Sequence, residues 1–219
     1  MDKDKLASQI AHLRKEYSSQ KLTEESVNKN PILQFEKWLQ ESLNINFFEA
    51  NSMMLSTVSK EGSPFSRIVL LKGFDESGFT FYTNYNSQKG KNIEQNALVS
   101  LSFFWIQLER QIHIHGKAIK VSAEESDDYF ASRPRGSQIG AWASSQSEVI
   151  ANRSVLENKY AEIEKLYDNK IVPRPPHWGG YIVAPTSIEF WQGRESRLHD
   201  RILYTKKENK EWLISRLSP

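Results

Sequence analysis

The sequence predicts a mainly β domain with peripheral helices, arranged as an antiparallel barrel or sandwich. From residue 52 onward, short strand-like runs follow one another, with turns such as SKEGSP and DESG between them. Few helical stretches intervene, which argues against a doubly wound parallel sheet. Neither GxGxxG nor GxxxxGK[ST] occurs, so the sequence gives no support for a Rossmann or P-loop nucleotide site.

The bulk composition narrows the function classes. A chain of 219 residues can bury one continuous core. The formal charge is only +2, from 29 basic and 27 acidic residues, so any anion chemistry must come from local clusters and not from a generally basic surface. The absence of cysteine excludes disulfides, zinc–thiolate sites, iron–sulfur clusters and a cysteine nucleophile. The charged N-terminus and the absence of a long apolar run predict a cytoplasmic protein.

The N-terminal region reads as separable from the rest. Residues 3–17 carry apolar side chains at the spacing of an amphipathic helix, and the polar run 18–30 reads as a linker. NPILQFEKWLQESL then begins a second helix, with Pro31 suited to its first turn. We therefore expect a mobile helix and linker over residues 1–30, which could act as a lid, and a single domain over residues 31–219.

The remaining elements are predicted from their patterns. Strands are expected at MMLSTVS, SRIVLLKGF, GFTFYTN, ALVSLSFFW and QIHIHGKAIKV, and later at YIVAP, SIEFWQ, RILYTKK and EWLISRL. Helices are expected at SQKGKNIEQN and at about residues 124–132 and 146–168. The stretch SRPRGSQIGAWASS is expected to join the last two helices as a connecting segment.

Several cations lie where they could bind an anion. In RIVLLK, Arg67 and Lys72 bracket four aliphatic residues, although a buried strand with charged ends would give the same pattern. Lys89 lies near an expected helix N-terminus, where free N–H groups favour a phosphate, although it could also be a solvated surface lysine. Arg133 and Arg135 flank a proline, and the planar guanidinium matches phosphate oxygens; an exposed basic turn remains the alternative.

The stretch FWQGRESRLHDRILY gathers charges and aromatics in one place. If RLHDR is extended, Arg197, His199 and Arg201 point to one side, while Leu198 and Asp200 point to the other. This alternation indicates an anion-binding face on a late strand, with the second set holding the strand in place.

A metal site and a hydrolytic site are both less well supported. His113 and His115 form an HxH pair that could bind a metal together with His177 or His199, but no completing carboxylate is evident. Paired histidines on a strand are more often hydrogen-bonded or solvated, so no metal is expected. No GxSxG elbow occurs.

Three ordered motifs carry a family resemblance. RIVLLKGFDESGFTFYTN, then SRPRGSQIGAWAS followed by QS, and then EFWQG with RLHDR four residues later resemble the pyridoxamine/pyridoxine 5′-phosphate oxidases of vitamin B6 metabolism, and the likeness runs from AHLRKEY to the C-terminus. The resemblance implies an FMN-binding split β-barrel and a homodimer with FMN at the subunit interface. It also implies oxidation of pyridoxine or pyridoxamine 5′-phosphate to pyridoxal 5′-phosphate. In that reaction hydride passes from C4′ to FMN N5, and O2 is reduced to H2O2; the amine also yields NH3.

The resemblance also implies roles for particular residues. The expected FMN contacts are Arg67, Ile68, Val69, Leu70, Leu71, Lys72, Tyr82, Thr83, Gln88, Lys89, Gln111, Gln146, Ser147, Trp191 and Arg201. The expected substrate contacts are Lys72, Tyr129, Arg133, Ser137, Arg197, Leu198 and His199, together with Arg14, Lys15, Glu16 and Tyr17 from a segment that closes over bound substrate. Arg197 is expected to stabilise charge on the substrate's oxygen substituent, and His199 to orient the same region and assist proton movement.

One position departs from the family pattern. The family usually has a basic residue just before the phosphate-loop lysine, and this chain has Gln88 there. An amide donates a hydrogen bond without charge assistance, so weaker retention of FMN is expected. Two other readings remain: another split-barrel flavin oxidoreductase, such as a nicotinamide-dependent flavin reductase, and a non-catalytic protein that binds FMN or pyridoxal phosphate.

Overall fold

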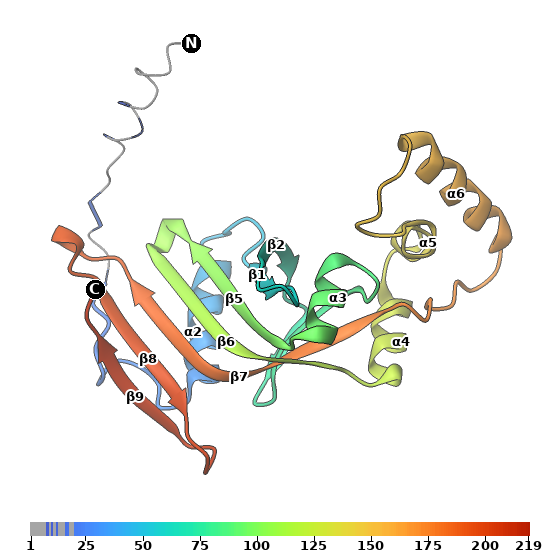
Figure 1. The fold of residues 1–219 in the computed structure, drawn as a ribbon. Coiled ribbons are helices and arrows are strands. Elements are labelled where there is room, and N and C mark those ends of the chain that lie inside the picture. The colour runs from blue at the N-terminus through green and yellow to red at the C-terminus, as the bar shows by residue number, and fades with distance from the viewer. Residues whose placement is uncertain (1–7, 9, 11, 13–15, 18–19) are drawn as a thin grey trace.

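The computed structural model describes residues 8, 10, 12, 16, 17 and 20–219, and within this part the chain forms one nine-stranded antiparallel sheet (Figure 1). The strands are β1 Ser52–Val58, β2 Pro64–Leu70, β3 Gly73–Asp75, β4 Gly78–Asn84, β5 Leu98–Trp105, β6 Arg110–Lys120, β7 Trp178–Gln192, β8 Asp200–Lys206 and β9 Trp212–Leu217. Their order is β2-β1-β5-β6-β7-β4-β3, and β8 pairs with β7 and β9. The sheet curls, so the prediction of a mainly β fold with peripheral helices is confirmed.

The helices begin where the sequence supplies caps. They are α2 Pro31–Asn44, α3 Gln88–Gln95, α4 Ala123–Ser132, α5 Arg135–Ala143 and α6 Arg153–Leu166, with 3₁₀ turns η1 Ile106–Leu108 and η2 Glu195–Arg197. The side chains of Asn30, Ser87 and Ser122 accept hydrogen bonds from the first turns of α2, α3 and α4. Each cap satisfies a backbone N–H that has no partner within its helix.

The main core lies between α2 and the curled sheet (Figure 1). Phe35 of α2 is fully buried and makes edge-on contacts with Phe79 at 4.9 Å and Phe103 at 5.1 Å between ring centroids. Trp38, one turn further along α2, packs edge-on against Phe190 of β7 at 5.2 Å. Burial of such rings contributes about 1.5–3 kcal/mol each, so this helix is fixed on the sheet.

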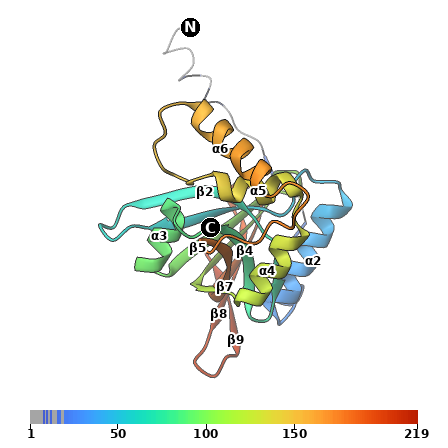
Figure 2. The same ribbon diagram turned by 90° about the vertical axis from the view of Figure 1, so that its right-hand side faces the viewer.

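A second, smaller core holds α4, α5 and α6 together at the end of β7 that lies away from β8 and β9 (Figures 1 and 2). It contains Phe130, Ile139, Ile163, Val172 and Trp178. Strand β7 is 15 residues long and runs from this helical end to the β8–β9 end. One strand therefore connects the smaller core to the β8–β9 end of the sheet.

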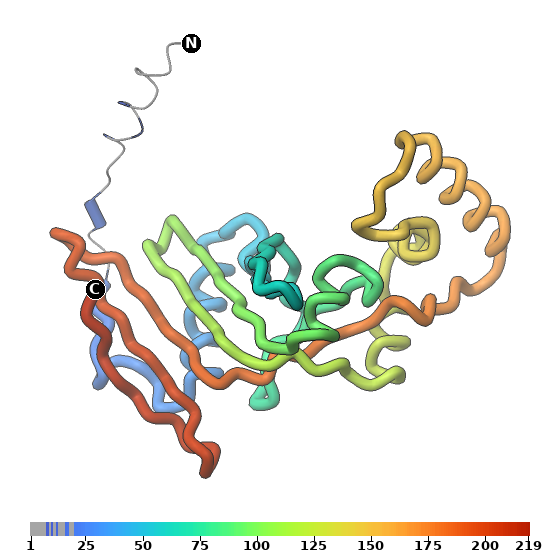
Figure 3. The backbone as a smooth tube through the Cα atoms, in the orientation of Figure 1, coloured from blue at the N-terminus to red at the C-terminus, as the bar shows by residue number. Residues whose placement is uncertain are grey.

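Residues 20–30 run beside β8 and β9 (Figure 3). Leu22 and Val27 are buried in the main core, and Tyr204 Oη donates a hydrogen bond to the carbonyl of Asn28 at 2.6 Å. Arg216 Nη2 donates to the carbonyl of Leu22 at 3.0 Å. This run, which the sequence suggests is a linker, is thus tied to the sheet. Most of the helix expected over residues 3–17 lies outside the described residues.

Three element predictions were wrong. The connecting stretch SRPRGSQIGAWASS contains helix α5, which starts directly after Pro134. Helix α6 begins at Arg153 and not near residue 146. YIVAP and SIEFWQ, expected as two runs, belong to the single strand β7. In the part of the chain that is described, no helix has the length and apolar character to span a membrane.

Candidate functional site

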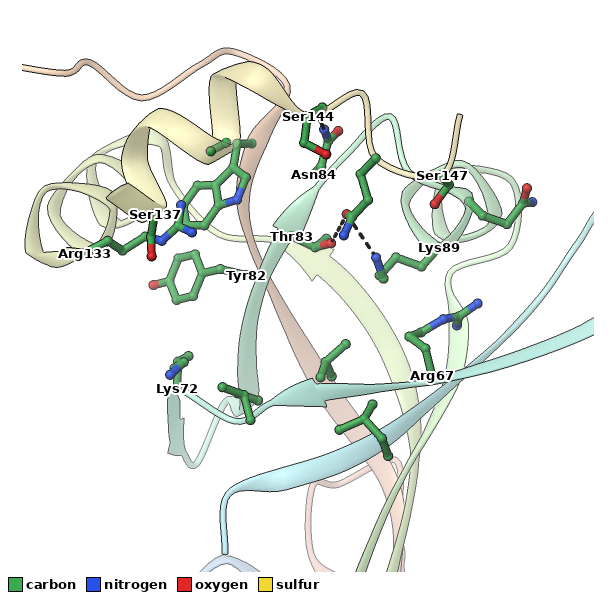
Figure 4. A pocket seen from close by; sticks show the side chains of 18 of the residues that line it. Arg67, Lys72, Tyr82, Thr83, Asn84, Lys89, Arg133, Ser137, Ser144 and Ser147 are labelled. Atoms are coloured by element: carbon green, nitrogen blue, oxygen red, sulfur yellow. Dashed lines mark hydrogen bonds between the residues drawn. The ribbon is translucent and has the colours of Figure 1, made fainter. Parts of the chain in front are cut away.

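A pocket of about 930 Å³ opens between β2, β4, α3 and α5 (Figure 4). We call it the cationic pocket. Its walls are formed by Phe65, Arg67, Ile68, Val69, Leu70, Lys72, Tyr82, Thr83, Asn84, Gln88, Lys89, Tyr129, Arg133, Pro134, Ser137, Gly140, Ala141, Ser144, Gln146, Ser147 and Trp178. Four of these residues are cationic and none is acidic.

The four cations stand at two ends of the pocket. Arg67 and Lys89 lie at one end, and Lys72 and Arg133 lie at the other, beside Tyr82 (Figure 4). Among the described residues, none of the four forms an ion pair with a carboxylate, whereas arginines elsewhere in the chain do. Unpaired cations in a partly buried wall raise the potential of the pocket and favour an anionic ligand at each end.

Lys89 is held at the N-terminus of α3. Its ammonium donates to Ser87 Oγ at 3.3 Å and to Gln146 Oε1 at 3.2 Å, and the side chain is 8% exposed. Burial, with a smaller contribution from the charge of Arg67, lowers the pKa of Lys89 to about 8. Lys89 therefore lacks the negative partner that a buried ammonium normally has, and a phosphate at the helix N-terminus would supply it.

Arg133 forms the opposite end. Its Nη1 atom is buried and has no hydrogen-bond partner among the described residues, and the guanidinium lies 4.4 Å from the centroid of the Trp178 ring. Burial lowers the pKa of Arg133. The rings of Tyr82 and Tyr129 stack beside it, 3.8 Å apart. An unsatisfied buried donor is costly, so this arrangement suits a ligand oxygen beside an aromatic platform.

Helix α5 explains why the two neighbouring arginines diverge. Arg133 is the extended C-cap of α4 and lines the pocket. Arg135 is the first residue of α5 and donates to the carbonyls of Lys170, at 2.9 Å, and Tyr167, at 2.5 Å, at the C-terminal end of α6. Of the two arginines that the sequence offers as phosphate contacts, one is available and the other anchors a helix.

A second group lies at the far end of β7, outside the pocket. We call Trp191, Arg197, His199 and Arg201 the β7–β8 cluster. The rings of Trp191 and His199 are 4.5 Å apart, and Tyr17 meets both edge-on at 5.8 Å. Arg201 is paired with both oxygens of Glu189, at 2.7 and 3.1 Å.

The stretch RLHDR is not extended throughout, so the predicted alternation was wrong for its first residues. Ser196 and Arg197 have φ of +55° and +60°, in the turn η2, and β8 starts only at Asp200. The backbone N–H of Arg194 donates to His199 Nδ1 at 3.1 Å, which closes this turn through a side chain. Leu198 is 69% exposed and does not anchor the strand.

Some of the predicted site residues thus line the cationic pocket, and the others lie outside it. The predicted residues that line the pocket are Arg67, Ile68, Val69, Leu70, Lys72, Tyr82, Thr83, Gln88, Lys89, Tyr129, Arg133, Ser137, Gln146 and Ser147. Those that do not are Leu71, which is buried in the core, and Glu16, Tyr17, Gln111, Trp191, Arg197, Leu198, His199 and Arg201. Arg14 and Lys15 lie outside the described residues.

Several wall residues were not predicted. They are Phe65, Asn84, Pro134, Gly140, Ala141, Ser144 and Trp178. Asn84 follows Tyr82 by two positions on β4, so strand alternation could have found it. Trp178 is distant in sequence, and no local pattern places it there. Among the described residues, no three His, Cys, Asp or Glu side chains are grouped as a metal would require.

The curled antiparallel sheet with peripheral helices places the chain in the class of split-barrel proteins. The family model described as pyridoxamine 5′-phosphate oxidase matches residues 37–167, and the model described as pyridoxine 5′-phosphate oxidase C-terminal dimerisation region matches residues 178–219. The chain therefore belongs to the pyridoxamine 5′-phosphate oxidase family and is an oxidoreductase. The match to the dimerisation region supports a homodimer.

Individual relatives agree with this assignment. A pyridoxine/pyridoxamine 5′-phosphate oxidase of Acaryochloris marina is 52% identical, over 99% of this chain and 98% of its own length. One of Paraburkholderia xenovorans is 54% identical, over 96% and 99%. The structure of PhzG from Burkholderia lata, in complex with tetrahydrophenazine-1-carboxylic acid, is 28% identical with a TM-score of 0.86, over 92% of this chain and 100% of that one. An FMN-binding protein from Nostoc punctiforme, 16% identical with a TM-score of 0.70 over 88% and 100%, shares the fold.

Proposed function

We propose that this protein binds FMN and oxidises pyridoxine 5′-phosphate or pyridoxamine 5′-phosphate to pyridoxal 5′-phosphate. The observation that carries the proposal is the cationic pocket, with unpaired cations at both ends and an orphaned guanidinium N–H of Arg133. Two fully ionised phosphate monoesters together carry about four negative charges. This total matches the four cationic side chains of the pocket wall, which contains no acidic side chain. The names of the relatives support the same substrates.

The pocket residues fit the cofactor and the substrate at separate ends. Arg67, Lys89 and the N-terminus of α3 would hold the FMN phosphate, because they provide two cations and free backbone N–H groups. Lys72 and Arg133, with the hydroxyls of Tyr129 and Ser137, would hold the substrate phosphate. FMN, when bound between these ends, would supply the redox chemistry of a hydride acceptor that O2 can reoxidise.

The active site would be shared between two subunits. Trp178 of the pocket and Trp191 of the β7–β8 cluster lie near opposite ends of β7, which at about 3.3 Å per residue separates them by about 40 Å along the strand. Arg197 and His199 do not line the pocket of their own chain. In a twofold dimer the partner's copy of the cluster can face this pocket, which agrees with FMN at the interface.

The partner's cluster would then position and polarise the substrate. Arg197 would place its guanidinium against the substrate ring and stabilise negative charge on the ring oxygen. His199 would act as a hydrogen-bond donor: its Nδ1 accepts the Arg194 N–H, so the neutral ring carries its proton on Nε2. Burial and the nearby charge of Arg197 lower the pKa of His199 and favour this neutral form. His199 would therefore orient the substrate through its Nε2–H, because protonation at Nδ1 would break the hydrogen bond from Arg194.

The visible spectrum of the purified protein tests the proposal directly. Under anaerobic conditions, added pyridoxine 5′-phosphate should bleach a flavin absorption band, and admission of O2 should restore it with release of H2O2. Unphosphorylated pyridoxine at the same concentration is the matched control and should leave the band unchanged, since it lacks the group that Arg133 would bind. A protein that retains no flavin after incubation with FMN and removal of the unbound cofactor would contradict the cofactor assignment.

The relationship to PhzG favours a second candidate, oxidation of a carboxylated polycyclic ring on the same fold. PhzG shares 28% identity and was crystallised with a tricyclic carboxylic acid. Arg133, set among the hydroxyls of Tyr129 and Ser137, favours the phosphorylated substrate instead. Turnover of both ligand classes in one assay separates the candidates, and peroxide release without NADPH separates both from a nicotinamide-dependent flavin reductase.

A further inference from the structure

A chain of three polar side chains crosses the outer face of the sheet. Ser102 of β5 lies directly opposite His113 of β6, and Gln111 precedes His113 by two residues on the same face. His113 Nδ1 is 3.1 Å from Ser102 Oγ, and His113 Nε2 is 3.2 Å from Gln111 Oε1. Both ring nitrogens are therefore engaged.

The donor and acceptor groups of the three side chains determine the direction of the hydrogen bonds between them. The amide oxygen of Gln111 can only accept, so Nε2 of His113 must carry the proton. In the neutral ring Nδ1 then accepts from the hydroxyl of Ser102. Donation runs from Ser102 to His113 to Gln111, which turns the amide NH2 of Gln111 away from the ring of His113.

The surroundings of His113 favour its neutral form. Glu189 lies directly opposite on β7, but both of its oxygens are paired with Arg201. His115 follows two residues along β6 on the same face. Burial lowers the pKa of His113, and the charges of His115 and Arg201 act in the same direction against the opposing effect of Glu189.

Gln111 is joined to the β7–β8 cluster by the register of the sheet. It lies directly opposite Trp191, and Trp191 in turn contacts His199 at 4.5 Å. Gln111 thus belongs to the surface that, under the proposed function, faces the cofactor in the partner's pocket. Ser102 and His113 are one step further along the same face, at the position opposite Glu189 of β7.

We propose that His113, supported by Ser102, is a positioning residue that turns the amide of Gln111 so that its NH2 group donates to the isoalloxazine ring of FMN. This inference rests on the proposed function. Carbonyl oxygens and ring nitrogens at the edge of that ring are acceptors, and negative charge builds on them when the ring is reduced. A fixed donor there stabilises the reduced form. The Ser102–His113 pair would raise the reduction potential of the flavin without touching it.

The test is a thermodynamic cycle on the midpoint potential of bound FMN. His113→Leu should lower the potential, shift the visible flavin band and reduce kcat by about twofold to tenfold, the range for one neutral hydrogen bond. KM and the dimer mass should stay close to the parent values. His113→Gln should recover part of the potential, because its amide can still donate toward Gln111. Ser102→Ala should act in the same direction as His113→Leu with a smaller effect, and it remains informative if His113→Leu fails to fold.

The most informative measurement is the midpoint potential of a double variant that combines His113→Leu with Gln111→Leu. If His113 acts through Gln111, then His113→Leu should cause no further fall in potential in a Gln111→Leu background. An additive effect, or an unchanged potential in both His113→Leu and Ser102→Ala, would overturn the inference. Failure of the proposed function looks different, because the parent protein itself would then bind no FMN.

Discussion

The cationic pocket and the β7–β8 cluster differ in whether their cations are paired with carboxylates. In the pocket, Lys89 and Arg133 are partly buried without carboxylate partners, and burial lowers the pKa of each. In the cluster, Arg201 is neutralised by Glu189, a bond that raises its pKa. The pocket therefore holds unpaired charge that a ligand can neutralise, while the cluster pairs Arg201 internally and offers aromatic rings and oriented donors. We therefore propose that the first region provides affinity and the second provides alignment.

The largest expected effect comes from removing a pocket cation. Arg133→Ala should raise KM for pyridoxine 5′-phosphate by about tenfold to a hundredfold, because a charge-assisted hydrogen bond is lost, with little change in kcat. Steady-state kinetics measure this split. Arg135→Ala is the matched control: it should loosen α6 and lower the melting temperature, while KM stays close to the parent value. An equal rise of KM in both variants would contradict the division of roles between the two arginines.

The cluster should respond with the opposite kinetic pattern. Arg197→Met should lower kcat/KM for pyridoxine 5′-phosphate by about tenfold, mainly through kcat, because it removes stabilisation of developing charge and leaves the phosphate contacts in place. FMN affinity, measured by fluorescence quenching, should be unchanged. Parent-like kcat/KM in this variant would remove the catalytic role assigned to Arg197.

Lys89 provides a pH test of the pocket. Its pKa of about 8 means that the ammonium is charged below pH 8 and loses its proton as the pH rises further. The dissociation constant of FMN should therefore be nearly constant from pH 6.5 to 7.5 and should then rise, approaching about tenfold per pH unit. Lys89→Met should bind FMN more weakly at pH 7 and lose this dependence. A pH dependence that survives in Lys89→Met would assign it to another group.

The smallest effect is expected at Gln88. Its amide donates to Asn92 Oδ1 at 2.8 Å and carries no charge at the rim of the pocket. Gln88→Arg should tighten FMN binding by a few fold, as a partly exposed charge contributes about 0.2–1 kcal/mol. Equilibrium dialysis at low and high salt measures it, and the gain should shrink with salt. Unchanged or weaker binding would show that the amide does not limit retention.

The sequence predicted the fold better than the site because the two depend on different information. Alternating apolar residues place the strands, and Asn30, Ser87 and Ser122 mark helix starts. Helix α5 was missed because its glycines and serine, following a proline, are typical of loops, whereas its contacts with α6 stabilise a helix. The left-handed conformation of Arg197 was equally invisible, since a hydrogen bond from the Arg194 N–H to His199 stabilises it.

The division of the predicted site could not be predicted either. The motifs give an ordered set of residues, but the distance between Tyr82 and Trp191 depends on the length and path of β7. Only the resemblance to the family suggested that a second subunit brings them together. The matches to the family and its dimerisation region confirm the family assignment and support the dimer, while the roles of single residues stay predictions.

The length of β7 has a genetic consequence. If each active site takes its pocket from one chain and its cluster from the other, a variant impaired in the pocket and a variant impaired in the cluster can complement each other. Subunits of Arg133→Ala and Arg197→Met, unfolded together and refolded in equal amounts, would give half mixed dimers, each with one intact and one doubly defective site, so about a quarter of all sites would be restored. Two alleles of this kind in one cell would therefore complement each other in part.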